Sequence, residues 1–228
     1  MCGRMVATTT AAKLAEWFGA RSVAAELGPS WNVAPGREVY VVAAGAGGLR
    51  LGTMRWGLVP SWSADPSSGP RPINARAESL LERPAFADAV VRRRCIVAAD
   101  GFYEWDADRR PVHLGSPDGA PLAFAAVWDR WTSPDGHPLL TVAVVTTAAG
   151  PDVAPLHDRM PAVLPRSTWF RWLHGDADSE VSSACSVLRP APAGTLAGRP
   201  ASPAVNNAAN DGPELLTSPG VEPPARLF

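Results

Sequence analysis

The second residue of the chain is a cysteine, in the sequence Met1-Cys2-Gly3-Arg4. An initiator methionine is normally removed when the next residue is small, which would leave Cys2 with a free α-amine beside its thiol. An α-amine has an ordinary pKa near ~7.7–8.0 and a thiol one near ~8.5, so both are partly deprotonated at neutral pH. This pair can form an imine with an aldehyde and then close a thiazolidine, or the thiolate can attack an amide or ester. The alternative is an inert, disordered second residue.

Two residues further along the chain could move protons. Glu104 lies within the aromatic run 102–105, and apolar neighbours raise the pKa of a carboxyl towards the range of a general acid or base. The alternative for Glu104 is a surface carboxylate at a strand end. His157 lies in a charged loop, where its imidazole could transfer a proton near neutral pH. The alternative for His157 is a structural loop histidine.

A polar pair in the middle of the chain is suited to a sugar-phosphate ligand. Asn74 and Arg76 flank Ala75, and in an extended segment residues two apart point to the same face. The alternative is a helix cap for Asn74 and a surface ion pair between Arg76 and Glu78. Three tryptophans in loops rich in Gly and Pro could stack on bases, although such residues are more often part of a core: Trp31, Trp56 and Trp62.

The composition limits the class of protein. The chain has 228 residues, 46% of them hydrophobic, and a net charge of −1, which gives no overall signal for a polyanion-binding protein. All but one of the 21 basic residues are Arg. The three cysteines show neither a disulfide pattern nor zinc spacing with the four histidines, so we expect no metal and no cofactor. Without a membrane-length apolar run or a signal peptide, we expect a cytoplasmic location.

The patterning predicts many short strands and a few short helices. We expect strands at 38–44, 49–56, 95–99, 121–128 and 139–146, and helices at 8–18, after 78, at 86–94 and at 168–173. Residues 31–36, 65–72 and 151–161 read as loops, and 190–203 as a Pro/Ala/Gly-rich stretch. The fold class is therefore α+β, a single domain on a mainly antiparallel, barrel-like sheet with short flanking helices.

Several motifs occur in one order along the chain. Together they resemble the SRAP (SOS-response-associated peptidase) family of abasic-site processing proteins, from Cys2 to about Leu216. Each motif alone is weak, but the ordered set is specific. They are Met1-Cys2-Gly3-Arg4, Trp31-Asn32-Val33-Ala34-Pro35, Trp56-Gly57-Leu58-Val59-Pro60, Asn74-Ala75-Arg76-Ala77-Glu78, Gly101-Phe102-Tyr103-Glu104-Trp105, Thr146-Thr147-Ala148, His157-Asp158-Arg159-Met160-Pro161, Val205-Asn206-Asn207 and Asn210-Asp211.

The resemblance implies a catalytic set. In the family the N-terminal cysteine forms a Schiff base with the ring-opened aldehyde of an abasic site and then a stable thiazolidine crosslink, a role that falls here on Cys2 once Met1 is lost. Asn74 would hydrogen-bond the crosslinked sugar. Glu104 would move protons in crosslinking and in β-elimination as a lyase, and His157 would promote ring opening and reversal. The resemblance also implies an ability to remove the leading methionine, which here could equally be removed by an aminopeptidase.

The resemblance further implies an SRAP domain over 2–216, followed by a flexible tail at 217–228. The partner would be single-stranded DNA containing abasic sites, bound without sequence preference by a monomer that has no membrane contact. The expected DNA-binding residues are Arg4, Asn32, Pro35, Trp56, Trp62, Arg76, Thr147 and Arg159.

Two other classes of function stay open from the residues alone. An N-terminal Cys before Gly also resembles glutamine amidotransferases with an N-terminal nucleophile, although these do not need the motifs around Asn74 or His157. A non-catalytic single-stranded DNA-binding module would use the Trp and Arg residues and would be unaffected by Cys2→Ala. A peptidase acting on other proteins has no recognisable peptide-binding segment here.

Overall fold

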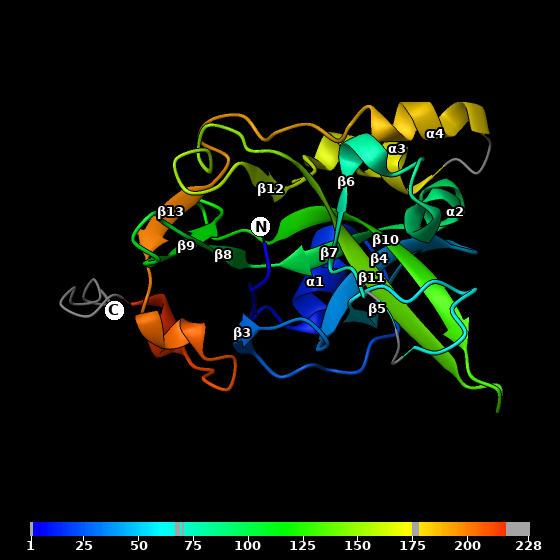
Figure 1. Ribbon diagram of the computed structural model, residues 1–228, viewed down its shortest axis with the longest axis horizontal. Helices are drawn as coiled ribbons and strands as arrows, with labels where there is room; N and C mark the ends of the chain where they lie inside the picture. Colours follow the sequence, from blue (N-terminus) through cyan, green and yellow to red (C-terminus); the bar gives the residue numbers. More distant parts are fainter. Residues whose placement is uncertain (1, 67–68, 70, 175–177, 218–228) are drawn as a thin grey trace.

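The computed structural model describes residues 2–66, 69, 71–174 and 178–217, without the side chains of 178–180. The expected flexible tail lies outside these residues, apart from Thr217. Figure 1 shows the short strands β8, β9 and β13 apart from the longer strands β10 and β11, with α2, α3 and α4 gathered together next to the longer strands. No helix in the described part of the chain is both long and apolar enough to span a bilayer.

Five strands of the larger sheet close into a barrel. Four of the pairings are antiparallel, between β4 and β5, β4 and β7, β7 and β10, and β10 and β11. A short parallel pairing of β11 with β5, which sets Thr141 opposite Arg55, joins the two ends of the ring. The expected barrel-like, mainly antiparallel sheet is confirmed. The strands are β4 (Glu38–Gly45), β5 (Gly48–Trp56), β7 (Arg94–Ala99), β10 (Leu122–Thr132) and β11 (Pro138–Ala148).

Alternation along these strands separates two buried faces. Tyr40 and Val42 pack with helix residues on the outside of the barrel. Val39 and Val41 belong to the cluster that fills the inside of the ring, which also holds Trp56. Small and β-branched residues dominate both faces, so each strand is an almost continuous apolar run in the sequence. Helices bury the outer face of the barrel, and packed side chains inside the ring bury the inner face.

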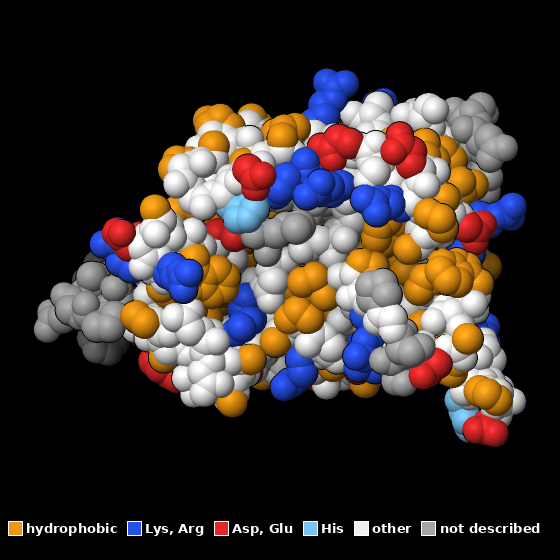
Figure 2. All heavy atoms as spheres, in the orientation of Figure 1, with side chains coloured by type: hydrophobic (Ala, Val, Ile, Leu, Met, Phe, Trp, Pro, Cys, Tyr) orange, Lys and Arg blue, Asp and Glu red, His pale blue; other side chains and the backbone are white. Residues whose placement is uncertain are grey.

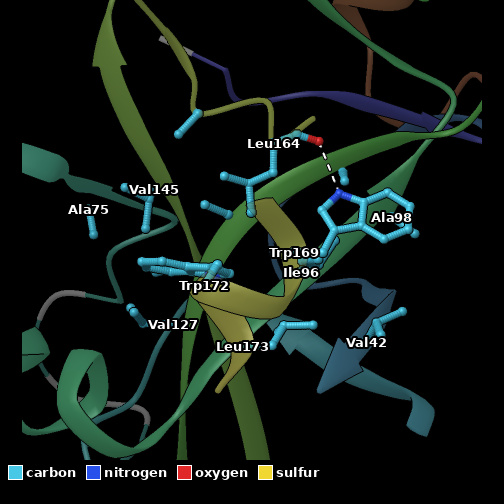
Figure 3. Close-up of a cluster of buried hydrophobic side chains, with 14 of the residues drawn as sticks. Val42, Ala75, Ile96, Ala98, Val127, Val145, Leu164, Trp169, Trp172 and Leu173 are labelled. Carbon is cyan, nitrogen blue, oxygen red and sulfur yellow. Dashed lines mark hydrogen bonds between the residues drawn. The ribbon is translucent and has the colours of Figure 1, made fainter. Parts of the chain in front are cut away.

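Four helices cover the outside of the barrel: α1 (Ala11–Phe18), α2 (Pro84–Arg92), α3 (Trp169–Leu173) and α4 (Asp178–Cys185). The hydroxyl of Thr10 caps α1, which begins later than the expected helix at 8–18, and Gly19 ends it in the left-handed conformation at φ 62°. Figure 3 shows Trp172 of α3 lying against Val127 and Val145 of the barrel, with the indole N–H of Trp169 donating to the Leu164 carbonyl at 3.0 Å.

The expected helix at 86–94 is shifted. It runs from Pro84 to Arg92, and Arg94 instead begins β7. The Arg94 side chain is buried and donates to the carbonyls of Val90, Val91 and Trp172 at 2.6–2.8 Å. It joins α2 to α3 and does not act as a solvent-exposed cation near the end of the helix.

The second sheet holds the start of the chain. Its strands are all antiparallel and follow the order β13 (Ala197–Pro200), β9 (Pro111–Gly115), β8 (Gly101–Trp105), β1 (Met5–Ala7) and β3 (Ser30–Val33). The carboxylate of Asp100, in the turn between β7 and β8, accepts hydrogen bonds from the backbone and hydroxyl groups of Thr8 and Thr9. This turn therefore fixes the first strand against β8.

Several short elements were not expected. Residues 31–36 were predicted as a loop, but β3 extends to Val33; the loop at 151–161 contains β12 (Arg159–Pro161), and the Pro-rich stretch contains β13. A helix was expected after residue 78, but β6 (Asn74–Arg76) is followed only by a 3₁₀ turn, and the next α-helix begins at Pro84. The remaining elements are β2 (Arg21–Ser22) and the 3₁₀ turns η1 (Ala77–Ser79), η2 (Arg166–Thr168), η3 (Pro203–Asn206) and η4 (Pro213–Leu216).

Candidate active site

Cys2 lies fully buried at the cluster that fills the barrel. The side-chain amide of Asn74 donates to the Cys2 carbonyl at 2.7 Å. Burial raises the pKa of the Cys2 thiol well above its usual range, and the nearby charge of Glu104 acts in the same direction. The thiol is therefore protonated at neutral pH, and its use as a nucleophile requires a base beside it.

Glu104 is positioned by the pairing of β8 with β1. Met5 lies opposite Phe102, and the Tyr103 amide donates to the Arg4 carbonyl at 3.0 Å, so Glu104 comes next to the first residues of the chain. Its side chain is only 2% exposed. Burial raises the pKa of the Glu104 carboxyl, the effect expected from its aromatic neighbours. A carboxyl whose pKa is raised holds its proton more readily than an exposed one, which suits a group that accepts and returns a proton.

His157 lies in the loop before β12, within electrostatic reach of Glu104, whose pKa it lowers. Its Nδ1 is 2.9 Å from the Arg159 amide nitrogen and 2.7 Å from a carboxylate oxygen of Asp158. One nitrogen cannot accept from the amide and donate to the carboxylate at once. In the neutral ring Nδ1 accepts from Arg159 and the proton sits on Nε2; a protonated ring pairs with Asp158.

β6 brings Asn74 and Arg76 to the same region through its parallel pairing with β11. As predicted, they flank a buried Ala75 on an extended strand. The Asn74 Oδ1 is buried and has no hydrogen-bond partner within the described residues, so it is an acceptor that a ligand can satisfy. Both residues line a cavity of about 480 Å³ together with Trp62, whose side chain is 68% exposed.

The structure therefore brings the four predicted catalytic residues together from four separate segments. Cys2 contacts Asn74 directly and Glu104 electrostatically, and Glu104 in turn interacts with His157. Figure 2 shows basic side chains gathered along one edge of a central hollow, with a His at its rim. Within the described part of the chain, no group of three or more His, Cys, Asp or Glu residues could hold a metal ion.

The expected DNA-binding residues differ in their placement. Trp62 and Arg76 are exposed and Pro35 lines a small cavity, so all three are accessible. Trp56 is fully buried, with its indole N–H donating to the Ile73 carbonyl at 2.9 Å, so its ring has no face open for stacking. Thr147 is also buried, and its hydroxyl donates to the Ala148 carbonyl at 3.0 Å.

Arg4 and Asn32 are occupied by an internal network. Arg4 donates to the Asn32 side-chain oxygen and to the Val205 carbonyl, both at 2.7 Å. The Asn32 amide nitrogen lies 3.0 Å from the Asn207 carbonyl and 2.7 Å from that of Asn210. The late asparagine motif thus owes its position to these hydrogen bonds, which local sequence patterns do not reveal because they connect residues far apart in the chain.

Arg159 forms a two-pronged ion pair with Glu78 at 2.8 and 2.9 Å, and also donates to the Thr146 carbonyl at 2.6 Å. The pair lowers the pKa of the Glu78 carboxyl below its usual range. The sequence suggested Arg76 as the ion-pair partner of Glu78, as the alternative to a ligand role. The observed pair leaves Arg76 without an ion pair to Glu78 and ties the His157 loop to η1.

Comparisons with known proteins agree on one family. The profile of the family described as SOS response associated peptidase (SRAP) matches residues 1–208. The abasic site processing protein YoqW of Bacillus subtilis (strain 168) is 34% identical over 224 residues, which cover 96% of this chain and 100% of that protein. The abasic site processing protein YedK of Escherichia coli (strain K12) is 30% identical over 189 residues, 82% of this chain and 83% of that protein.

Solved structures share the fold. A protein from Bacteroides thetaiotaomicron superimposes with a TM-score of 0.83 at 21% identity, covering 95% of this chain and 99% of that one. A protein from Bordetella bronchiseptica gives a TM-score of 0.76 at 24% identity, covering 88% and 100%. At these identities the likeness establishes the α+β architecture.

Proposed function

Since this chain belongs to the SOS response associated peptidase (SRAP) family, we propose that it processes abasic sites in single-stranded DNA by trapping them covalently on Cys2. The observation that carries the proposal is the convergence of Cys2, Asn74, Glu104 and His157 on one site. The names of YoqW and YedK, which describe processing of abasic sites, support the choice of substrate.

The proposed reaction needs no cofactor. After removal of Met1, the Cys2 amine adds to the C1′ aldehyde of the ring-opened abasic sugar to give a carbinolamine, which loses water to form an imine. The Cys2 thiol then adds to the imine carbon, its proton passing to the nitrogen, and closes a thiazolidine. The balance is aldehyde plus cysteine giving thiazolidine plus one water.

Glu104 has the properties that these proton transfers require. Its raised pKa lets it take a proton from the amine or the thiol and return one to the departing hydroxyl. Such a base is needed because burial keeps the Cys2 thiol protonated. The unsatisfied Oδ1 of Asn74 would accept a hydrogen bond from a sugar hydroxyl, and the exposed guanidinium of Arg76 would hold a neighbouring phosphate.

We further propose that His157 gives a proton to the sugar ring oxygen as the C1′–O4′ bond breaks on ring opening, and takes that proton back from the O4′ hydroxyl as the ring re-forms during reversal of the crosslink. With an imine on Cys2, abstraction of the proton α to the imine carbon by Glu104 would lead to β-elimination of the 3′ phosphate, a lyase activity. Removal of Met1 by the protein itself would use the thiol of Cys2 with Glu104 and His157.

The decisive experiment is a denaturing gel of the protein with single-stranded DNA that carries one abasic site. Mass spectrometry first establishes that the N-terminus is Cys2, and intact DNA is the control. The expected result is a heat-stable shifted band that requires both the lesion and Cys2. Absence of any adduct from a correctly processed protein would contradict covalent trapping.

Two variants separate imine formation from ring closure, because both keep the α-amine of residue 2 and neither has the thiol. Cys2→Ser and Cys2→Ala should each give an imine that borohydride traps but little heat-stable adduct without reduction. Both should keep their affinity for DNA. If wild type and Cys2→Ala behave alike in every assay, the chain is a non-covalent DNA-binding module.

A further inference from the structure

We propose that Arg55 and Arg71 form a second anion pocket, which binds a backbone phosphate of the DNA strand near the site of crosslinking. The inference rests on the proposed function for its ligand, but its residues are separate from the catalytic set. The pocket has a volume of about 280 Å³, and Pro35, Gly36, Trp56, Gly57 and Ile73 complete its lining.

Neither guanidinium is neutralised within the described residues. The ion pairs of the described chain involve other arginines, and neither Arg55 nor Arg71 donates a side-chain hydrogen bond there. Glu38, which lies opposite Arg55 on β4, lines a different cavity beside Arg37. Two like charges at one concave surface repel each other unless an anion joins them, so the pocket is electrostatically suited to a negatively charged group.

Two glycines keep the pocket open. Gly36 and Gly57 have φ of 87° and 125°, conformations that other residues rarely adopt. A Cβ at Gly57 would lie within 3.7–3.9 Å of Arg71 and Ile73, and one at Gly36 within 4.0 Å of the Arg55 guanidinium. Side chains at these positions would fill the space that a phosphate needs.

The pocket is joined to the catalytic site by a short rigid connection. Ile73 lines the pocket, and the next residue is Asn74, which holds Cys2. The Ile73 carbonyl accepts from the Trp56 indole at 2.9 Å and from the Val144 amide at 2.9 Å, so this segment is fixed to the barrel. Pro72, one residue earlier, lines the larger cavity that contains Arg76. Segment 71–76 therefore borders cationic cavities at both ends.

This placement favours a phosphodiester over other anions. A strand whose abasic sugar reaches Cys2 must carry phosphates on both sides of that sugar. Arg76 is available to one of them, and the pocket of Arg55 and Arg71 is available to another on the same strand. Binding of one phosphate by Arg76 and of another by Arg55 and Arg71 would hold the abasic sugar next to Cys2.

The test measures affinity by fluorescence anisotropy for single-stranded 15-mers with one central tetrahydrofuran, a stable abasic analogue that fixes the register and cannot form an imine. One phosphate at a time is replaced by an uncharged methylphosphonate. Arg55→Ala and Arg71→Ala are compared with wild type and with Arg130→Ala, an exposed arginine near the far end of the β10–β11 hairpin, as the matched control. Melting temperatures verify folding, and Arg55→Gln, which removes the charge but keeps a long polar side chain, replaces Arg55→Ala if that variant does not fold.

We expect each alanine variant to bind about three- to tenfold more weakly. The slope of log K against log salt should fall by about 0.7 for each phosphate that the variant no longer neutralises. Methylphosphonate at one position should lower the affinity of wild type and Arg130→Ala for the strand. The same replacement should not change the affinity of the Arg55 and Arg71 variants. Free inorganic phosphate at millimolar concentration should compete weakly, because the pocket recognises a phosphate held within a strand.

Two negative results are distinguishable. If wild type does not bind the single strand at all, the proposed function fails. If wild type binds but the variants show its affinity, salt slope and methylphosphonate profile, the function stands and the pocket of Arg55 and Arg71 does not bind DNA. Competition by free phosphate without any effect of the methylphosphonates would overturn the phosphodiester assignment.

Discussion

Asn74 holds Cys2 by its backbone: the side-chain amide of Asn74 donates to the Cys2 carbonyl at 2.7 Å, across 72 positions of sequence. The same side chain keeps its Oδ1 unsatisfied at the edge of a cavity, within the described part of the chain. One residue thus fixes Cys2 with its donor and keeps a buried acceptor without a partner among the described residues.

Replacing Asn74 by Asp should therefore impair both roles. The donor becomes an acceptor facing the Cys2 carbonyl, which leaves that carbonyl without its hydrogen bond at a cost of about 1–3 kcal/mol. We expect crosslinking to abasic DNA to slow by about 10- to 100-fold, from a displaced nucleophile. The rate of adduct formation on denaturing gels measures this, with Asn206→Asp, an exposed asparagine, as the control. An unchanged rate of adduct formation would mean that Asn74 has no part in crosslinking.

Glu104→Gln should stabilise the protein while reducing its activity. The raised pKa means that the folded state resists ionisation of this carboxyl, so wild-type stability is lost as the pH rises from the ordinary value near ~4.3 through the raised folded pKa. Glutamine is never ionised and avoids this loss. At neutral pH we expect a higher melting temperature, with roughly 2–4 °C for each 1 kcal/mol regained, and slower crosslinking.

Thermal melts of wild type and Glu104→Gln between pH 4 and 8 test the sign of this effect. The two curves should converge at the acid end and diverge as the pH rises. Parallel curves would mean that the charge of Glu104 is compensated in the folded protein.

His113 should make the fold sensitive to acid. Burial, aided by the charge of Arg199, lowers the pKa of His113 to about 4, and its ring packs edge-on against Tyr103 at 5.5 Å. Between pH ~6.5, the ordinary pKa of histidine, and pH about 4, His113 is protonated in the unfolded chain but not in the folded one. Stability should therefore fall by up to about 3 kcal/mol as the pH drops through this range.

Urea unfolding of wild type and His113→Gln at pH 7 and pH 4.5 measures this contribution. The variant should lose less stability than wild type on acidification, even if it is weaker at pH 7. His137→Gln, at an exposed position of the β10–β11 turn, should follow wild type at both pH values. A wild-type pH dependence in His113→Gln would assign the acid sensitivity to other groups.

Asn32→Ala should act on stability rather than on DNA binding. The substitution removes the partner of Arg4 and of the carbonyls of Asn207 and Asn210, all in a network that is largely buried. We expect a decrease of about 2–4 kcal/mol in the free energy of unfolding and faster proteolysis after residue 200. Asn207→Ala removes only a local bond to the Ala209 amide and should cost less than about 1 kcal/mol.

DNA affinity, measured at a temperature at which both variants are folded, separates the two roles of Asn32. An affinity within about twofold of wild type agrees with the internal network, since removal of a charge-assisted hydrogen bond to DNA would weaken binding more than this. A large decrease of DNA affinity in the folded Asn32→Ala variant would mean that Asn32 contacts DNA.

Local patterns were sufficient to predict the barrel strands. β4, β5, β10 and β11 are long, apolar and bounded by turns, so their existence follows from their own residues. The burial of Glu104 was also predictable, because its aromatic neighbours on β8 form part of the core. These features depend on residues adjacent in sequence.

The features that local patterns did not predict depend on partners far away. β1, β9 and β13 are only three to five residues long and are strands because of their neighbours in the sheet. Arg94 was expected within the helix at 86–94, yet it begins β7 and donates to four carbonyls, two of them about 80 residues away in sequence. Trp56 sits in a loop-like motif that suggested stacking, but the closure of the barrel buries its ring.

The closing pairing of Arg55 with Thr141 has a kinetic consequence. It joins strands that lie far apart in the chain, and the loop-closure entropy must be overcome before the pairing contributes, so the ring is a late event in folding. The segment that carries Asn74 pairs with the same strand, β11. The hydrogen bond from Asn74 to the Cys2 carbonyl therefore belongs to the closed barrel, and a nascent or partly unfolded chain carries Cys2 without it.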